Sequence, residues 1–474
     1  MAANYLHGVE TIELNIGPRP ISVVKSAVIG LVGVAPKGPT QTLTLVQSQA
    51  DAAQFGSLVP GFSIPRALES IQAQGSGTIL VVNVFDATAN TVQVTDEIHE
   101  IENGQFQLDD HPLVDLAFSA NIAGETDLLI LGTHYTLDEF GVFKALAGGV
   151  LSEGETVAVS YKKFDPSTVT SSQIIGAITS GVRTGGKLFE EAYQRFGFTP
   201  RIFIAPNYST ITAVSAEMLV WADKYRGHSI LDGADDATPS GVIQSRGPLA
   251  NSPFATSSKR AILVYPRLKA YDPATDADIE VPYSAFMAGV IAATDNKDGY
   301  WFSPSNREIK GITGLERMIT FAINDANTEA NLLNEKGIVT IANSFGTGIR
   351  TWGNRSAAFP TSTAPSNFIS VQRTADVIHE SIELAMLQFM DLPINDALID
   401  AIRDTGNGFM NVLVQRGAVI DGSVTYDPAK NPPVELAAGH ITFDITFMPP
   451  TPAERITFES YIDINLLANL GTNQ

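Results

Sequence analysis

Cysteine is absent from this 474-residue sequence, and charged residues are scarce. The lack of cysteine excludes disulfide bonds, thiolate metal sites and cysteine nucleophiles, and it agrees with assembly in a reducing cytoplasm. Charged side chains make up 17% of the residues, whereas about 25% is usual in soluble domains. A large chain with so little charge is expected to bury much of its surface against other chains.

Basic residues are also in the minority, since 30 Lys and Arg face 51 Asp and Glu and give a formal charge of −21. This charge disfavours binding to nucleic acid or to an anionic lipid surface, so we expect no direct nucleic-acid partner. No apolar run approaches the roughly eighteen residues of a membrane span, so membrane insertion is not expected. The nine-residue run from Ala27 to Ala35 is broken by Gly30 and Gly33, and it is interpreted as a buried strand instead of a signal sequence.

One segment approaches an enzyme motif, the run Gly-Val-Arg-Thr-Gly-Gly-Lys-Leu from Gly181 through Lys187 to Leu188. It matches a phosphate-binding P-loop except at Leu188, where a Ser or Thr hydroxyl should bind Mg²⁺. In such a loop, residues 173–179 would form the preceding strand and residues 189–196 the following helix. We favour a plain loop before a helix, and a nucleotide-binding α/β enzyme stays open as the alternative.

Other motifs of catalysis and ligand binding are missing. The seven histidines have no paired ligand spacing, residues 295–299 do not fit a calcium loop, and no Gly-x-Ser-x-Gly elbow occurs. Gly30 and Gly33 lack the third glycine of a dinucleotide-binding loop and are interpreted as strand and turn glycines. The sequence therefore predicts no catalytic residue, no metal site and no cofactor.

The chain length suggests about three domains. Apolar β-branched runs at 26–34 and 78–85, with a helix near 65–74 between them, predict the start of an α/β core. Turn signals and a strand at 156–161 then predict a β-rich insertion, after which the core resumes with strands at 201–205 and 261–265 and a helix from about Thr210. The predicted boundaries are 21–86 for the first part of the core, 87–166 for the insertion and 167–355 for the second part of the core.

A further domain is predicted from residue 356 to residue 450. A helix ends before Pro393, Asn395 is expected to cap the next helix, and residues 441–447 alternate as a strand. The run Pro449-Pro450-Thr451-Pro452 then forms a semi-rigid spacer before the C-terminus. The predicted fold class is an α/β core domain with an inserted β-rich domain, an α+β C-terminal domain, and extended N- and C-terminal strand arms.

The two arms, residues 1–20 and 451–474, each carry an alternating strand pattern with one apolar face. That face consists of Ile12, Leu14 and Ile16 in the first arm and of Ile456, Phe458, Ile462, Ile464 and Leu466 in the second. Burying five such side chains contributes roughly 8 to 15 kcal/mol, which is similar to the cost of ordering the backbone of the arm. We therefore predict that the arms pair with a sheet edge of another copy, and the alternative is that each closes an edge of its own domain.

Five segments, taken in order, resemble the contractile bacteriophage tail sheath family. They are residues 5–11 with 27–38, residues 299–306 (Gly-Tyr-Trp-Phe-Ser-Pro-Ser-Asn) with 309–311, residues 333–338 (Leu-Asn-Glu-Lys-Gly-Ile), residues 348–355 (Gly-Ile-Arg-Thr-Trp-Gly-Asn-Arg) and residues 452–456 (Pro-Ala-Glu-Arg-Ile). The interval 87–166 resembles the insertion that larger sheath proteins carry on their outer surface. Trp301 and Trp352 are interpreted as packing anchors, and Arg355 as a residue that ties down a loop through backbone carbonyls.

The resemblance implies a structural role and no enzymatic activity. Subunits of this family polymerise as sixfold rings around an inner tail tube and link through exchanged arms, and contraction drives the tube through the bacterial envelope without nucleotide hydrolysis. The implied partners are further copies of the chain, the inner tail tube protein, and baseplate and tail terminator proteins. The implied location is the virion tail, assembled in the host cytoplasm. The sheath of a bacteriocin-like or secretion-type injection system stays open as an alternative, whereas a tail tube is disfavoured because tube subunits are typically small β proteins.

The resemblance also implies an inner attachment helix in the C-terminal domain, which we place at residues 395–416. Arg403 and Arg416 are cations in an acidic chain and are the candidate contacts with carboxylates on a tube. The alternative for Arg403 is a local pair with Asp400 or Asp404.

Overall fold

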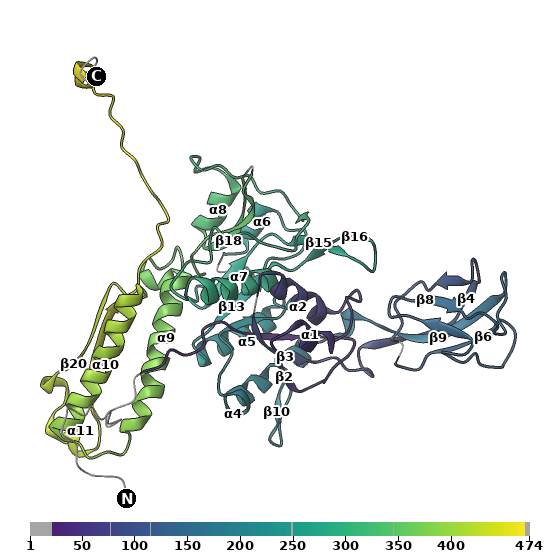
Figure 1. Ribbon diagram of the computed structural model, residues 1–474, viewed down its shortest axis with the longest axis horizontal. Coiled ribbons are helices and arrows are strands. Elements are labelled where there is room, and N and C mark those ends of the chain that lie inside the picture. Colours follow the sequence, from purple (N-terminus) through teal and green to yellow (C-terminus); the bar gives the residue numbers. More distant parts are fainter. Residues whose placement is uncertain (1–20, 76, 114, 248–249, 345, 470–474) are drawn as a thin grey trace, which may run out of the picture.

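The computed structural model describes residues 21–469 except 76, 114, 248, 249 and 345 (Figure 1). An eight-stranded sheet forms its centre, in the order β19-β18-β14-β13-β12-β1-β3-β2. The six inner strands are parallel, while β2 and β19 run antiparallel to their neighbours at the two edges. The strands are β1 (Val28–Gly33), β2 (Leu43–Val46), β3 (Thr78–Asn83), β12 (Ile202–Ile204), β13 (His228–Asp232), β14 (Ala261–Val264), β18 (Ile338–Ser344) and β19 (Gly348–Trp352).

Helical segments cover both faces of the sheet, and two glycines of β1 allow them to approach closely. A Cβ atom on Gly30 would lie 2.9 Å from the ring of Phe189 in the 3₁₀ helix η2 (Gly185–Glu191). A Cβ atom on Gly33 would lie 2.3 Å from Oγ of Ser63, the first residue of α2 (Ser63–Ala73). Residues three apart on a strand face opposite sides, so η2 and α2 cover opposite faces. The interpretation of these residues as strand glycines is confirmed.

The longer core helices complete the two layers. Helix α7 (Tyr283–Lys297) packs on α2, and α5 (Thr212–Lys224) joins the η2 side through an edge contact of 5.6 Å between the rings of Trp221 and Phe189. The predicted helices near 65–74 and from about 210 are confirmed. The shorter elements of this part are α1 (Gln49–Ala53), η1 (Pro166–Thr168), α3 (Ser171–Ile175), β10 (Ile178–Thr179), β11 (Val182–Arg183), α4 (Ala192–Phe196), α6 (Pro239–Gln244), β15 (Leu268–Asp272), β16 (Ala277–Val281), β17 (Gly314–Leu315) and α8 (Glu329–Glu335).

A β-rich body projects from the core between β3 and η1, on the right of Figure 1. It contains two three-stranded sheets, β4-β9-β6 and β5-β8-β7, around a hydrophobic cluster of its own. At its base Phe164 stacks on Phe62 of the core at 4.1 Å and meets Phe85 edge-on. The strands are β4 (Thr91–Glu100), β5 (Gln105–Gln107), β6 (Ser119–Ile122), β7 (Tyr135–Leu137), β8 (Val142–Ala145) and β9 (Thr156–Phe164), so the predicted strand at 156–161 is confirmed.

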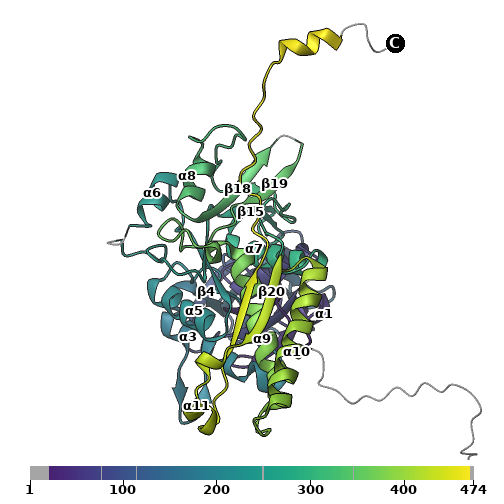
Figure 2. The same ribbon diagram turned by 90° about the vertical axis from the view of Figure 1, so that its left-hand side faces the viewer.

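The C-terminal part packs two long helices against a two-stranded sheet (Figure 2). Its helices are α9 (Ile369–Met386) and α10 (Asp396–Arg416), and the side chain of Asn395 accepts a hydrogen bond from Leu398 N at 2.9 Å, which confirms the predicted cap. Strands β20 (Asp421–Tyr426) and β21 (Phe443–Met448) pair antiparallel. The remaining elements are η3 (Pro365–Asn367), η4 (Leu387–Phe389), η5 (Pro428–Lys430), α11 (Pro433–Ala437) and η6 (Ile464–Asn469).

A row of ion pairs joins α9 to the core. Four charged residues at spacings of three and four lie along this helix, and each binds an oppositely charged residue of the core. The pairs are Arg373 with Asp295, Asp376 with Arg260, Glu380 with Arg201, and Glu383 with Arg226. Ion pairs thus accompany apolar contacts of α9, such as that of Ile369 with the core cluster, in joining the C-terminal part to the core.

Candidate linking arms and neighbouring surfaces

The C-terminal arm leaves the body and extends into solvent (Figures 1 and 2). The five apolar residues predicted to share one face have exposed fractions between 64% and 101%. The predicted strand is not formed, because residues 449–463 have no regular structure and Ile464 and Leu466 belong to η6. In this structure the arm lies away from the sheet edges of its own subunit, so its backbone has no strand partner and forms no ladder.

The N-terminal arm residues Ile12, Leu14 and Ile16 lie outside the described residues. The root of this arm, residues 21–27, is described and lies along the C-terminal part, where Ile21, Val23 and Val24 pack on its hydrophobic cluster. The amide of Val24 donates to Oγ of Ser381 in α9 at 3.2 Å. This end of the chain is thus fastened to α9 before it continues into the arm.

The sheet of β20 and β21 offers an edge that could receive an arm. Within the described part of the chain, β20 and β21 pair as strands only with each other. The outer edge of β20 faces α10, where the side chain of Asn407 accepts a hydrogen bond from Val424 N and donates one to Val424 O, both at 2.8 Å, so the outer edge of β21 is the one left for a further strand. Ile445 and Phe447 of β21 are half-buried. A strand added to the edge of β21 would gain ladder hydrogen bonds and an apolar surface.

The two candidate tube contacts differ in their surroundings. Arg403 pairs with Asp400 at 2.9 Å and with Asp404 at 3.0 Å, so the local pairing considered as the alternative is present. Arg416, in the last turn of α10, is exposed and forms no ion pair among the described residues. Arg416 is therefore the more available of the two cations.

The segment that approaches a P-loop does not form a phosphate cradle. Residues 178–183 make a short hairpin, β10 and β11, that turns at Gly181, and of the expected strand at 173–179 only residues 178–179 are strand, while 173–175 belong to helix α3. A Cβ atom on Gly186 would lie 2.0 Å from the indole of Trp221, which shows that this glycine is needed for packing. Lys187 forms an ion pair with Glu217. The glycines and the lysine thus serve local structure, and the geometry gives no support to the nucleotide-binding alternative.

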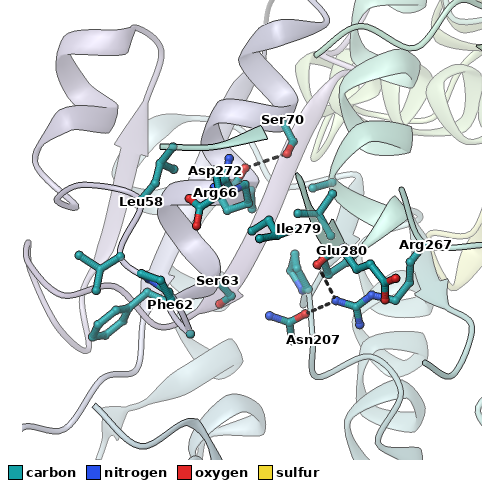
Figure 3. Close-up of a pocket in the computed structure, with 18 residues that line it drawn as sticks. Leu58, Phe62, Ser63, Arg66, Ser70, Asn207, Arg267, Asp272, Ile279 and Glu280 are labelled. Atoms are coloured by element: carbon teal, nitrogen blue, oxygen red, sulfur yellow. Dashed lines mark hydrogen bonds and ion pairs between the residues drawn. The ribbon is translucent and has the colours of Figure 1, made fainter. Parts of the chain in front are cut away.

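A small pocket of about 120 Å³ lies near the carboxyl ends of the core strands (Figure 3). The strand order reverses between β1 and β12, and ligands of open α/β sheets often bind at such a point. The two guanidinium groups that line it are occupied: Arg66 pairs with Asp272 at 2.5 Å, and Arg267 pairs with Asp235 at 2.5 Å and donates to Asn207 at 3.3 Å. The pocket therefore has no unpaired arginine to hold an anionic substrate.

Asp232, at the end of β13, is a fully enclosed carboxyl group with a structural task. It accepts hydrogen bonds from the amide and hydroxyl of Ser284 at 2.8 and 2.6 Å and from the hydroxyl of Ser209 at 2.8 Å. Burial raises the pKa of Asp232 above its ordinary value, while these hydrogen bonds oppose the shift. The group ties the start of α7 to the sheet and is closed to solvent, so we assign it no catalytic role.

Among the described residues, two groups of side chains have ligand atoms close enough to hold a metal ion. The first is Glu97, His99 and Asp109 in the β-rich body, and the second is Asp236, Glu280 and Glu316 in the core. In the first group both oxygens of Glu97 are already engaged, one by His99 Nε2 at 2.6 Å and the other by the hydroxyl of Tyr161 at 2.7 Å. Hydrogen bonding within the protein therefore accounts for this group.

Across the described residues, none of the helices combines the length and apolar character needed to cross a membrane.

Comparison with known proteins assigns the chain to a family. Residues 181–357 match the model of the phage tail sheath protein central domain, and residues 361–463 match that of the phage tail sheath C-terminal domain. The tail sheath protein of Burkholderia phage BcepMu is 41% identical over 475 residues, covering 99% of each chain. The chain belongs to the phage tail sheath family. It is accordingly a structural subunit of a contractile tail sheath.

More distant sheath proteins have the same fold. The tail sheath protein of Escherichia phage P2 is 24% identical over 480 residues, again covering 99% of both chains. The helical sheath of the anti-feeding prophage in its contracted state superimposes with a TM-score of 0.60 at 17% identity, covering 97% of this chain and 100% of that chain.

Two motifs that resemble the sheath family meet in the structure. Arg355, at the end of the motif 348–355, pairs with Glu454 of the motif 452–456. Trp352 meets Phe321 edge-on at 5.0 Å and Trp301 packs on the C-terminal cluster, in agreement with their interpretation as packing residues. Arg355 was expected to tie down a loop through backbone carbonyls, but its partners are side chains. Sequence reasoning did not find this contact, because 99 residues separate the two partners and nothing in either motif identifies the other as its partner in the fold.

Sequence reasoning also missed an exposed apolar tip of this sheath protein, formed by the last turn of α9 and the segment that connects it to α10. It comprises Leu384, Leu387, Met390, Leu392 and Ile394, all at least 36% exposed. Such a group could have been found from the excess of apolar residues in a segment between two helices.

Proposed function

We propose that this sheath subunit polymerises as sixfold rings around an inner tail tube and that its two arms link neighbouring subunits. The observation that carries the proposal is the combination of an exposed apolar C-terminal arm with a two-stranded sheet in which β21 has no second strand partner in the described part of the chain. Each subunit thus carries both the strand to donate and the edge to receive it. Addition of the arm of one copy to the sheet of another would satisfy both.

In this proposal the polymer contracts and drives the tube through the bacterial envelope, and the subunit acts as a structural element without enzymatic activity. Its partners are other copies of the chain, the tube protein, and the baseplate and tail terminator proteins. Assembly takes place in the host cytoplasm and the product is the virion tail. Links made by extended arms suit this task because they can persist while the rigid bodies rotate.

The proposed tube contact is α10, with Arg416 as its principal cation and Arg403 as a second. The charge of Arg403 is compensated by its two aspartate neighbours, whereas Arg416 is available for a carboxylate on the tube. Its position in the last turn of the helix also places it at the end where a cation is stabilised by the helix dipole.

Removal of the residues after Pro452 tests the linking role. The truncated subunit is expected to stay folded, because every residue from Ala453 onward is exposed up to Leu467, and to lose the ability to form cylinders. Circular dichroism and thermal unfolding measure the first property, and sedimentation with negative-stain microscopy measures the second. Normal cylinders from the truncated subunit would refute the proposed linkage.

A matched control replaces only Ile456, Phe458 and Ile462 with Ser and keeps the arm at full length. This variant is expected to lose polymerisation to a similar extent, since the apolar face is removed while the chain can still reach its neighbour. Polymerisation at the level of the unchanged protein would show that the apolar face does not form the link.

A further inference from the structure

The root of the C-terminal arm is held to the body at one side chain. Pro449 is buried and Pro450 and Pro452 are half-buried, but the residues that follow are exposed. In the described residues beyond Glu454, the hydrogen bonds join arm residues to one another, as between Tyr461 and Glu459. Glu454 is thus the last point at which a side chain of the arm is bonded to the body.

Arg355 is held in place independently of the arm. Its guanidinium carbon lies 4.3 Å from the ring centre of Phe359 and 4.1 Å from that of Phe368, so aromatic rings flank the group. Its Nη1 donates to Oδ1 of Asn367 at 2.8 Å, and its backbone forms a β-bridge with Phe368. The planar group is therefore oriented before it meets a carboxylate, a geometry that lysine could not reproduce.

The remaining donors of Arg355 point to the arm. Nε donates to the two carboxylate oxygens of Glu454 at 2.9 and 3.1 Å, and Nη2 donates to Oε2 at 2.5 Å. The side chain of Arg355 is 17% exposed and that of Glu454 is 43% exposed. The pair lies beside a broad groove that is lined by the arm root together with Trp301, Phe302 and Trp352.

We propose that the pair of Arg355 with Glu454 is a latch that sets the direction in which the C-terminal arm leaves the subunit, and that Arg355 is a positioning residue for linkage to a second copy. The proposal rests on the proposed linking function of the arms. A flexible tether samples many directions, whereas an arm fixed at its root spends more of its time near one partner edge. The latch thus raises the effective concentration of the arm at the neighbouring subunit.

The direct test measures the direction of the arm in the unassembled subunit. Because the chain has no cysteine, Thr363→Cys and Thr457→Cys introduce spin labels at only two places, one on the exposed body and one on the arm. Glu454→Gln is expected to widen the distribution of distances between the labels at least twofold. The matched control is Glu459→Gln, which removes the same charge from the same arm at a residue bonded only to Tyr461, and it should leave the distribution unchanged. Equal distributions in both variants would overturn the latch.

A second measurement tests the consequence for assembly. Glu454→Gln and Arg355→Lys are each expected to raise the critical concentration for polymerisation about two- to fivefold, as for the loss of a partly exposed ion pair, while Glu459→Gln leaves it unchanged. A wider distance distribution with an unchanged critical concentration would refute the positioning role. Normal polymerisation after deletion of the whole arm would instead refute the linking function, and the distance measurement would still report on the latch.

Discussion

At the scale of single residues, His228 is a fully buried imidazole among cations. It opens β13, is 1% exposed, and faces Arg260, Arg373 and Lys259. Its Nε2 has no hydrogen-bond partner among the described residues, and His228 lines a small cavity together with Arg201, Arg226, Asp376 and Glu380. Burial first, and the neighbouring positive charges second, hold the pKa of His228 well below its ordinary value of 6.5.

This shift predicts a loss of stability in mild acid. The unfolded chain takes up a proton on His228 near pH 6.5 and the folded chain does not. The stability that depends on the neutral imidazole is therefore fully present above that pH and is lost as the pH falls below it. Between pH 6.5 and 5, His228 should lower the free energy of unfolding by about 1.4 kcal/mol for each pH unit of acidification. His228→Asn lacks this contribution, so its free energy of unfolding should fall less steeply than that of the unchanged protein. Urea unfolding at several pH values measures the difference. His440→Asn removes an exposed histidine and should keep the steeper slope, and equal slopes for the unchanged protein and His228→Asn would contradict the prediction.

At the scale of secondary-structure elements, the ion pairs along α9 form a series that runs from buried to exposed. The side chains of Arg373 and Asp295 are 5% and 2% exposed, whereas those of Arg226 and Glu383 are 36% and 61% exposed. A charge left without its partner in the protein interior is costly, while one left in solvent is readily hydrated. The same kind of ion pair should therefore contribute very different amounts to the free energy of unfolding at the two ends of the helix.

Two matched substitutions test this gradient. Asp295→Asn is expected to lower the free energy of unfolding by about 3 to 5 kcal/mol, because Arg373 would stay buried without a carboxylate. Glu383→Gln, at the exposed end, is expected to cost only about 0 to 1 kcal/mol. Urea unfolding at neutral pH compares the two variants, and similar costs would show that burial does not set the strength of these pairs.

Helix α10 allows the proposed tube contact to be tested with two cations of the same element. Arg416→Glu is expected to weaken assembly around purified tail tubes, most clearly at low salt where screening is weak, and to leave tube-free sheath polymers intact. Arg403→Glu should have the smaller effect on tube binding, since Asp400 and Asp404 already compensate its charge. Unchanged assembly of Arg416→Glu around tubes at low ionic strength would place the tube contact elsewhere.

At the scale of the whole molecule, the β-rich body is attached to the core over a limited base. The body has its own hydrophobic cluster, while its base contributes Leu113 to the core cluster and stacks Phe164 on Phe62. Thr91 and Phe164 are paired neighbours on β4 and β9, so the chain enters and leaves the body at one place. Insertions with this geometry can be removed without opening the domain that carries them.

A deletion based on that geometry should give a functional subunit. Residues 92–163 are replaced by Asn-Gly, a two-residue turn that can join the paired residues Thr91 and Phe164. The variant retains Asn90, which is fully buried and accepts a hydrogen bond from Gln173 at 3.0 Å. We expect a folded protein that still forms cylinders, visible by negative-stain microscopy with a reduced outer diameter. A folded variant that cannot polymerise would refute an outward-facing, dispensable body.

Local sequence patterns were sufficient to predict many of the strands and helices. The apolar runs at 26–34 and 78–85, the cap at Asn395 and the break at Pro393 depend on neighbours within a few residues, so the sequence alone predicts the corresponding strands and helices. The absence of cysteine required a noncovalent assembly, and the alternating ends indicated arms. The order of short motifs indicated the sheath family.

Only the tertiary structure decided how distant residues combine. It brought Arg355 to Glu454, aligned the charges of α9 with four residues of the core, and turned the glycines of 181–186 into a hairpin and a packing contact with Trp221. The path of the folded chain determines these contacts, and the spacing of residues in the sequence does not predict which distant residues meet. The C-terminal arm is the opposite case, because its alternating sequence predicts a strand that the isolated subunit does not contain: a strand needs a neighbouring strand to supply its hydrogen-bonding partners, and the arm has none here.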